Sequence, residues 1–309
     1  MSIVIIRNDG KTDLWKAALL RQDSTVKVYD HREDHPREAI TMALIWKHPK
    51  GSLRPYPNLK CIASAGAGVD FIFEDPEAPT HLPITRVVDP YLASDMSEHV
   101  LAVILGELKH LYAYKAQQLA GHWQPRSYAR IQDVTVGVMG LGELGALTAK
   151  DLARVGFRVL GWSRTQKDIP GVSCFHGEAG QREFLSKANM LVCLLPLTPE
   201  TTGILNREVF ARLPKGAYVV NVARGGHLVD VDLLEQIDAG HLSGACLDVY
   251  HQEPLPKGHP FWKHPKIMMT PHYASVSDTH SVVPQILENY HRLSSGKELL
   301  HQVDKDKGY

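Results

Sequence analysis

The segment VTVGVMGLGELG, residues 134–145, places three glycines between an apolar run and a stretch with helical patterning. These glycines are Gly140, Gly142 and Gly145, with GxGxxG spacing. A strand, a glycine turn and a helix in this order are typical of a dinucleotide-binding βαβ unit. In such a unit the first glycine makes the tight turn, the second admits a pyrophosphate and the third lets the helix pack on the strand. We therefore predict that the backbone amides of Glu143 and Leu144 face phosphate groups.

The end of the next predicted strand, FRVLGW at 157–162, indicates which dinucleotide fits. NAD sites usually carry Asp or Glu about 20 residues past the glycines, on the ribose hydroxyls. Here the strand is followed by Ser163, Arg164 and Thr165, and no carboxylate stands at its end. A hydroxyl and a guanidinium suit a 2′-phosphate, so we predict a preference for NADP(H), with NAD(H) possible. The alternative is an exposed Arg164 without a role.

The alternation of short apolar runs with helical segments predicts parallel α/β sheets. A chain of 309 residues favours two domains, at about 100–200 residues each. We predict two Rossmann-like, doubly wound parallel-sheet domains with the active site in the cleft between them. The substrate-binding domain is expected to be discontinuous, residues 1–98 plus 277–309, and the NADP-binding Rossmann domain to span 99–276.

A long helix and an extended arm are expected between the two strand series. The stretch 95–121 has capping-box spacing at Asp95 and Glu98 and a stop at Gly121, which predicts one helix. The segment HWQPRSYARIQD, 122–133, carries aromatic residues and arginines that suit a partner surface. A loop lying on its own domain is the alternative.

Composition excludes several classes of partner. Lys plus Arg and Asp plus Glu both number 34, which argues against nucleic acid. No apolar run approaches the ~18 residues of a membrane span, and the N-terminus MSIVIIRNDG is too short for a signal peptide. The 4 scattered cysteines indicate free thiols in a reducing compartment, so we expect a cytoplasmic protein. His31 and His35 lie in a charged loop, and we predict no metal site.

Three polar residues follow predicted strands of the second series. Arg224 comes after AYVVNV, Glu253 after GACLDVY and His272 after KIMMTP. Because ligands bind at the carboxyl ends of parallel strands, we expect all three to border one crevice. Gly225 and Gly226 let the turn behind Arg224 form without a Cβ penalty.

These residue types suit the reduction of a small anionic carbonyl compound. A carbonyl that accepts a hydride must also gain a proton, which a histidinium can donate near neutral pH. A carboxylate bonded to that imidazole fixes its orientation. An arginine can bind a substrate carboxylate and polarise the adjacent carbonyl. We therefore predict that Arg224, Glu253 and His272 are catalytic.

A second glycine segment, SAGAGVD at 64–70, also follows a predicted strand. It has GxG but no third glycine, and prolines soon interrupt any helix. Its backbone amides suit a small anion better than a dinucleotide.

The blocks GLGELG, LLPLTPETTGILN, LPKGAYVVNVARGG, LDVYHQEPLP and TPHYAS resemble, in order and spacing, signature blocks of the D-isomer-specific 2-hydroxyacid dehydrogenases. The resemblance covers nearly the whole chain. HWQP, GWSRT and the ending QVDKDKGY are similar to its bacterial glyoxylate/hydroxypyruvate reductase A branch. This implies NADPH-dependent reduction of small 2-keto acids, glyoxylate and hydroxypyruvate, to glycolate and D-glycerate. It also implies a homodimer joined through the cofactor domains, with the arm embracing the partner.

The resemblance also implies residue roles. Arg224 falls on the substrate-binding arginine, Glu253 on its acidic partner and His272 on the acid/base histidine. The amides of Ala67 and Gly68 fall on those that bind the substrate carboxylate.

Further cofactor contacts come from the same resemblance. They are Asp248, against the nicotinamide carboxamide, and Leu195, Pro196 and the carbonyl of Ala223 in the cofactor groove. Trp46 is a further candidate for the pocket wall, and a core tryptophan is the alternative.

The chain departs from many relatives at two positions. His227 stands where they have a small or apolar residue after the glycines, and Tyr273 follows the catalytic histidine. We expect neither to touch the chemistry, although both leave substrate preference open.

Two other functions stay open. One is a related dehydrogenase for another small 2-hydroxy acid or anion; formate enzymes carry an amide where Glu253 stands, which argues against formate. The other is a non-catalytic dinucleotide-sensing protein, against which the presence of Arg224, Glu253 and His272 argues.

Overall fold

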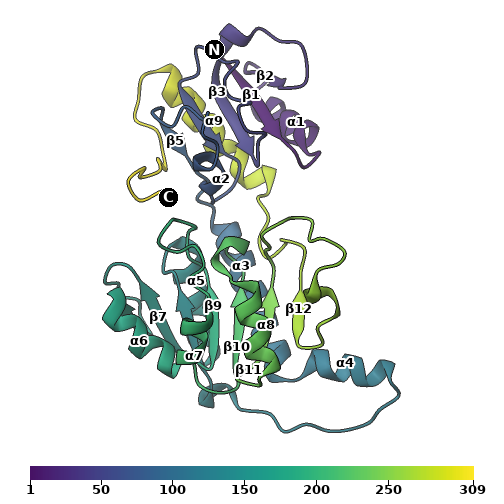
Figure 1. Ribbon diagram of the computed structural model, residues 1–309. Helices are drawn as coiled ribbons and strands as arrows, with labels where there is room; N and C mark the ends of the chain where they lie inside the picture. Colours follow the sequence, from purple (N-terminus) through teal and green to yellow (C-terminus); the bar gives the residue numbers. More distant parts are fainter. The chain divides into compact units, whose positions relative to one another are not determined.

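The computed structural model describes residues 1–309 and divides into two compact units. Unit 1 comprises Met1–Tyr91 and Val276–Tyr309, and unit 2 comprises Leu92–Ser275 (Figure 1). Each unit contains one sheet in which every strand pair is parallel. The predicted fold class, two parallel-sheet α/β domains, is confirmed.

Unit 1 has a five-stranded sheet in the order β2-β1-β3-β4-β5. The central strands β1, β3 and β4 are short runs buried on both faces, as is typical of parallel sheets. The strands are β1 Ser2–Arg7, β2 Lys27–Asp30, β3 Ile40–Trp46, β4 Cys61–Ser64 and β5 Ile84–Thr85. The helices are α1 Thr12–Gln22, α2 Asp70–Phe73 and α9 Thr279–Ser294, and α1 packs against α9.

A buried hydrogen bond between His48 and Asp75 fixes the loop that follows β3. His48 Nε2 lies 3.1 Å from Asp75 Oδ2, which also accepts the Gly51 amide at 3.0 Å. Burial lowers the pKa of His48, although Asp75 opposes that shift. Burial also opposes ionisation of Asp75, but hydrogen bonds from Gly51, Glu77 and His48 leave its pKa below the ordinary value. Both shifts favour a neutral imidazole that donates to a carboxylate.

Unit 2 has a seven-stranded sheet in the order β12-β11-β10-β9-β6-β7-β8. The apolar runs named from the sequence form β6, β7, β10, β11 and β12, whereas no run was named for β8. The edge strand β8 has no fully buried residue, so no apolar run marks it. The strands are β6 Thr135–Met139, β7 Arg158–Ser163, β8 Val172–His176, β9 Met190–Cys193, β10 Ala217–Asn221, β11 Leu242–Leu247 and β12 Ile267–Met269.

The single helix predicted over 95–121 is wrong, because the structure has two helices there. α3 spans Pro90–Leu108 and α4 spans Leu111–Leu119, with His110 between them at a φ of 56°. A Cβ on Gly106 would lie 2.7 Å from the Tyr112 hydroxyl oxygen. The ring of Tyr112, which follows the break, therefore packs on Gly106, which precedes it. The other helices of unit 2 are α5 Glu143–Val155, α6 Gly177–Lys187, α7 Arg207–Arg212 and α8 Asp230–Asp238.

The cysteines are all free, and the three buried ones lie within strands β4, β9 and β11. Burial raises the pKa of Cys61, Cys193 and Cys246 to about 12, so these thiols behave as core residues. None of the helices combines the length and the apolar character that crossing a membrane would require.

Candidate active site

The glycine loop joins β6 to α5, and its three glycines meet different constraints. Gly140 has a φ of 98°, and a Cβ there would lie 2.5 Å from the Leu194 carbonyl oxygen. A Cβ on Gly145 would lie 1.8 Å from the Gly140 carbonyl oxygen, so only glycine lets α5 start this close to β6. Gly142 is exposed, and a Cβ there would meet nothing within 4 Å. No contact within the protein therefore requires glycine at position 142.

The first turn of α5 leaves its amide groups available. Gly142 is the N-cap and provides no side-chain cap, and the first helical bond runs from Ala146 N to Gly142 O at 2.8 Å. The amides of Glu143 and Leu144 thus have no intrahelical acceptor. Together with the open side of Gly142, this arrangement fits the pyrophosphate of a dinucleotide.

The predicted 2′-phosphate contacts lie at the carboxyl end of β7, which is the sheet neighbour of β6. Ser163 is buried and its hydroxyl donates to the Thr165 carbonyl at 2.8 Å, so it shapes the turn. Arg164 and Thr165 are exposed. The charge of Arg164 helps to lower the pKa of Glu200, after hydrogen bonds from Thr198 and the Glu200 backbone.

The predicted cofactor-groove residues Leu195, Pro196 and Ala223 follow β9 and β10. Leu195 is buried, and the Pro196 carbonyl accepts the Thr201 hydroxyl at 2.7 Å. The Ala223 carbonyl accepts Arg224 Nη1 at 2.7 Å. Both carbonyls therefore already have donors within the chain.

Arg224, Glu253 and His272 follow β10, β11 and β12, which are adjacent in the sheet. His272 Nδ1 lies 2.7 Å from Glu253 Oε2, and the two side chains are 24% and 21% exposed. The other oxygen of Glu253 accepts the Tyr250 amide at 3.1 Å. Because the carboxylate occupies Nδ1, the ring has Nε2 left for exchange of a proton.

Asp248 holds the segment that carries His272. Its buried carboxylate accepts the Thr270 hydroxyl and the amides of Tyr273 and Ala274, at 2.8 and 3.0 Å for the amides. Its carbonyl accepts the His272 amide at 2.8 Å, where His272 has a φ of 56°. Sequence reasoning missed this contribution, which only the buried position of an aspartate at the end of a strand could have signalled.

The turn behind Arg224 is defined by close backbone contact. The Arg224 carbonyl accepts Asn221 Nδ2 at 3.0 Å. A Cβ on Gly225 would lie 2.0 Å from the Tyr250 carbonyl carbon, so this glycine lets the turn pack on the segment that leads to Glu253.

The substrate-binding candidates Trp46, Ala67 and Gly68 belong to unit 1. The Ser64 hydroxyl accepts the Gly66 amide at 3.2 Å and donates to the Gly68 carbonyl at 2.9 Å, which shapes the loop. Trp46 packs on that loop, since a Cβ on Gly66 would lie 2.3 Å from its ring. Ala67 and Gly68 are partly exposed. Their roles toward a substrate stay predictions.

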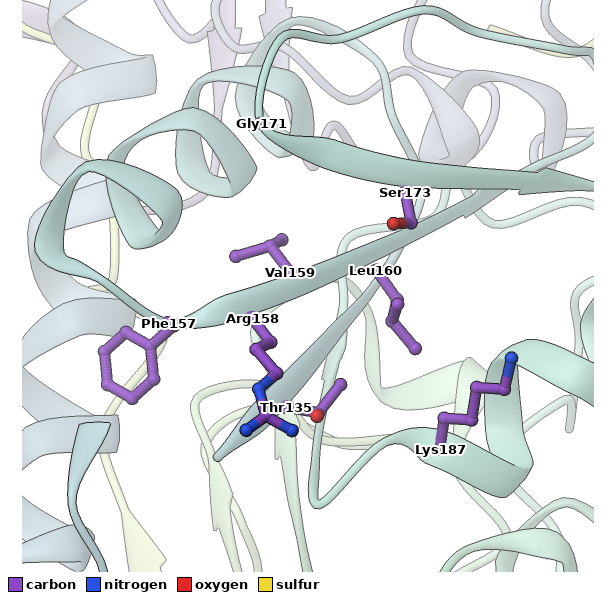
Figure 2. Close-up of a pocket in the computed structure, with 8 residues that line it drawn as sticks. All are labelled: Thr135, Phe157, Arg158, Val159, Leu160, Gly171, Ser173 and Lys187. Atoms are coloured by element: carbon purple, nitrogen blue, oxygen red, sulfur yellow. The ribbon is translucent and has the colours of Figure 1, made fainter. Parts of the chain in front are cut away.

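A cavity of about 490 Å³ in unit 2 contains none of the predicted site residues (Figure 2). It lies around the amino ends of β6 and β7, whereas the candidate residues follow the carboxyl ends of their strands. We therefore place the candidate active site at the carboxyl edge of the sheet. The cavity is lined by Thr135, Phe157, Arg158, Val159, Leu160, Gly171, Ser173 and Lys187.

Comparison with known proteins identifies relatives along the whole chain. Residues 101–274 match the family model described as D-isomer specific 2-hydroxyacid dehydrogenase, NAD binding domain. The chain is 36% identical to glyoxylate/hydroxypyruvate reductase A of Serratia proteamaculans and 37% identical to that of Klebsiella pneumoniae, with all of both chains covered.

Solved structures are similar over the same extent. A D-isomer specific 2-hydroxyacid dehydrogenase from Xanthobacter autotrophicus, in complex with NADPH and MES, has a TM-score of 0.94 and 38% identity, covering 100% of this chain and 99% of that one. An NADPH-dependent glyoxylate/hydroxypyruvate reductase from Sinorhizobium meliloti, in complex with NADP and sulfate, has a TM-score of 0.93 and 38% identity, covering 100% of both.

The different surroundings of Gly142 and Gly145 predict different effects of alanine. Gly142→Ala should fold with an unchanged melting temperature, because the new methyl group meets no protein atom within 4 Å. It should bind NADPH at least ~10-fold more weakly, because the methyl group would occupy the space expected for the pyrophosphate. Gly145→Ala should lower the melting temperature itself, because the methyl collides with the Gly140 carbonyl. Differential scanning fluorimetry and NADPH titration measure both effects. Equal behaviour of the two variants would contradict the assignment.

Proposed function

Because the chain belongs to the D-isomer specific 2-hydroxyacid dehydrogenase family, we propose that it reduces glyoxylate and hydroxypyruvate to glycolate and D-glycerate with NADPH. The observation that carries this proposal is the 2.7 Å contact between His272 Nδ1 and Glu253 Oε2, at the edge of the sheet where Arg224 also emerges. Relatives named glyoxylate/hydroxypyruvate reductase A, at 35–37% identity over the whole chain, support the substrate class.

In this proposal each of the three residues has one task. Arg224 binds the carboxylate of the 2-keto acid and withdraws charge from its carbonyl. His272 donates a proton from Nε2 to the keto oxygen, while Glu253 holds the ring by Nδ1 in the required orientation. When bound, NADPH supplies the hydride. Asp248 keeps the His272 segment in place through its bonds to Thr270, Tyr273 and Ala274.

The substrate carboxylate needs more donors than one guanidinium. We propose that the amides of Ala67 and Gly68 supply them, as the family resemblance implies, and that Trp46 shapes the loop that carries them. The contact of Trp46 with Gly66 supports the second part, since a larger residue at 66 would displace the ring.

We test the function with a panel of 2-keto acids and the variants His272→Asn and Glu253→Gln. His272→Asn should lower kcat/KM for glyoxylate at least ~10²-fold, because the proton donor is lost, with NADPH affinity unchanged. Glu253→Gln should cost less, since the ring stays but loses its charged partner. His264→Asn is a matched control, because His264 also pairs with a carboxylate, Asp238, at 3.2 Å.

Three outcomes would count against the proposal. Near-normal turnover by His272→Asn would refute the role of this histidine. Tight NADPH binding by the wild type without turnover of any panel member would favour a dinucleotide sensor. Turnover confined to another small acid would replace the substrate class and leave the chemistry in place.

The cofactor is NADPH, with Arg164 as the residue that selects it. Arg164 is exposed at the end of β7, next to the strand β6 that leads into the glycine loop, and residues 163–165 include no carboxylate. Structures of relatives in complex with NADPH and NADP support the choice.

Replacing Arg164 should therefore change cofactor selectivity. Arg164→Ala is expected to lower the NADPH/NADH ratio of kcat/KM about 10- to 100-fold, the range for losing a charged hydrogen bond of about 1.5–3 kcal/mol. Arg158→Ala, at the opposite end of the same strand, should leave the ratio unchanged. An unchanged ratio in Arg164→Ala would show that selectivity lies elsewhere.

We also propose that the protein is a homodimer joined through α4 and the segment after it. Helix α4 has no buried residue, and Trp123, Leu119 and Tyr128 are 95%, 79% and 62% exposed. The segment is nevertheless ordered on the helix, since Arg126 N donates to the Tyr114 hydroxyl at 2.9 Å. Figure 1 shows α4 and the segment after it at the margin of unit 2. Large apolar side chains exposed along one stretch of the chain are typical of an interface.

The dimer proposal predicts a change of mass when these side chains become polar. Leu119→Ser with Trp123→Ser should shift the protein from dimer to monomer in light scattering, with the melting curve still cooperative. Trp262→Ser changes a tryptophan that is 54% exposed elsewhere in unit 2, and should have no effect on mass. A wild-type protein that is monomeric at micromolar concentration would refute the proposal.

A further inference from the structure

We propose that His227 is a positioning residue, which sets the place of Arg224 by bridging its turn to the segment at Pro196. The inference rests on the proposed function, because it presumes that Arg224 binds the substrate carboxylate. His227 itself reaches neither substrate nor cofactor in this proposal, and it acts through the main chain.

The geometry of the imidazole is that of a bridge. His227 is 0% exposed and ends the short 3₁₀ turn η3, Gly225–His227. Its Nδ1 lies 3.2 Å from the Arg224 carbonyl oxygen, and its Nε2 lies 3.1 Å from the Pro196 carbonyl oxygen. Each ring nitrogen therefore faces a main-chain acceptor, one on each of the two segments.

The carbonyls of Arg224 and Pro196 differ in the number of other hydrogen bonds that they accept. The Arg224 carbonyl already accepts Asn221 Nδ2 at 3.0 Å and the His227 amide at 3.2 Å. The Pro196 carbonyl accepts one other donor, the Thr201 hydroxyl. Since a carbonyl has two lone pairs, the hydrogen on Nε2 is the one that adds a bond. The link from His227 to Pro196 thus carries the bridge.

Other contacts brace the same turn. On one side, Gly203 N donates to the Gly226 carbonyl at 2.9 Å and Leu205 N to the His227 carbonyl at 2.8 Å. On the other side, His251 Nε2 lies 2.8 Å from the Leu228 carbonyl oxygen. These contacts fix the part of the turn that follows Gly225. The side chain of His227 adds a further contact, to Pro196, closer to Arg224 in the same turn.

A buried polar side chain such as His227 lowers the stability of the fold unless its hydrogen bonds offset the loss of hydration. A buried imidazole without hydrogen bonds would be destabilising, and an apolar side chain would fill the same space. A misplacement of about 1 Å in a substrate-binding group can lower the rate about 10²-fold. The rate that depends on holding the Arg224 turn against Pro196 can therefore outweigh the cost of burying the imidazole. It also connects the predicted substrate anchor to the predicted cofactor groove.

The experiment compares three replacements of His227. The side-chain nitrogen of Gln can take the place of Nε2 and that of Asn the place of Nδ1, while Leu removes both. His227→Leu should raise KM for glyoxylate at least ~10-fold with a smaller change in kcat, since binding of the carboxylate is what Arg224 supplies. His227→Gln should recover most of that loss, and His227→Asn should behave like His227→Leu.

A binding assay makes the result independent of turnover. Oxalate, a small dicarboxylate, is titrated into the complex of the protein with NADPH, and its Kd is read from the nucleotide fluorescence. His227→Leu should weaken oxalate about 10-fold and change the Kd of NADPH less than twofold. In an Arg224→Ala background the same substitution should weaken oxalate no further, because His227 acts through Arg224.

The outcomes separate this inference from the proposed function. Wild-type protein that neither turns over 2-keto acids nor binds oxalate would refute the proposed function. An active wild type with an unchanged His227→Leu would overturn only the role of His227. Equal rescue by Asn and Gln, or an added loss in the Arg224→Ala background, would also overturn it. Should His227→Leu not fold, the contrast between Gln and Asn decides.

Discussion

Every strand of the unit 2 sheet runs in the same direction, and the candidate site depends on that constraint. Parallel strands deliver all their carboxyl ends to one edge, so segments that are far apart in the chain emerge together. The glycine loop follows β6, while Arg224, Asp248 and His272 follow β10, β11 and β12. The contact between His272 and Glu253 is a consequence, since both lie on connections that begin at that edge.

Some features could be predicted from the sequence because their signals are local. The glycine spacing marks Gly140 and Gly145, and the structure shows that a Cβ on either would collide with backbone. The edge strand β8 could not be predicted, because none of its side chains is buried and no continuous apolar run marks it. The break at His110 was missed because helical patterning continues through it, and the packing of Tyr112 on Gly106 is visible only in three dimensions.

The candidate site shows the same division. Arg224, Glu253 and His272 could be named in advance because each follows an apolar strand. The supporting groups could not, because their partners are distant in sequence: Asp248 accepts the amides of Tyr273 and Ala274. His227 was expected to stay outside the chemistry, and no sequence pattern shows that its ring reaches the carbonyl of Pro196.

The buried polar groups around the site act in the same way, because each one restricts the geometry of a turn. Asn221, Asp248 and His227 are each at most 1% exposed, in a core that could have been apolar. Asn221 and Asp248 bond to backbone atoms of the turns that carry Arg224 and His272, and His227 links the Arg224 turn to the carbonyl of Pro196. A buried hydrogen bond adds little net stability, but an unpaired partner is costly, so such groups tolerate one arrangement of the turns and penalise the others. The sheet therefore brings the reacting side chains to one edge, and these buried groups set their geometry there.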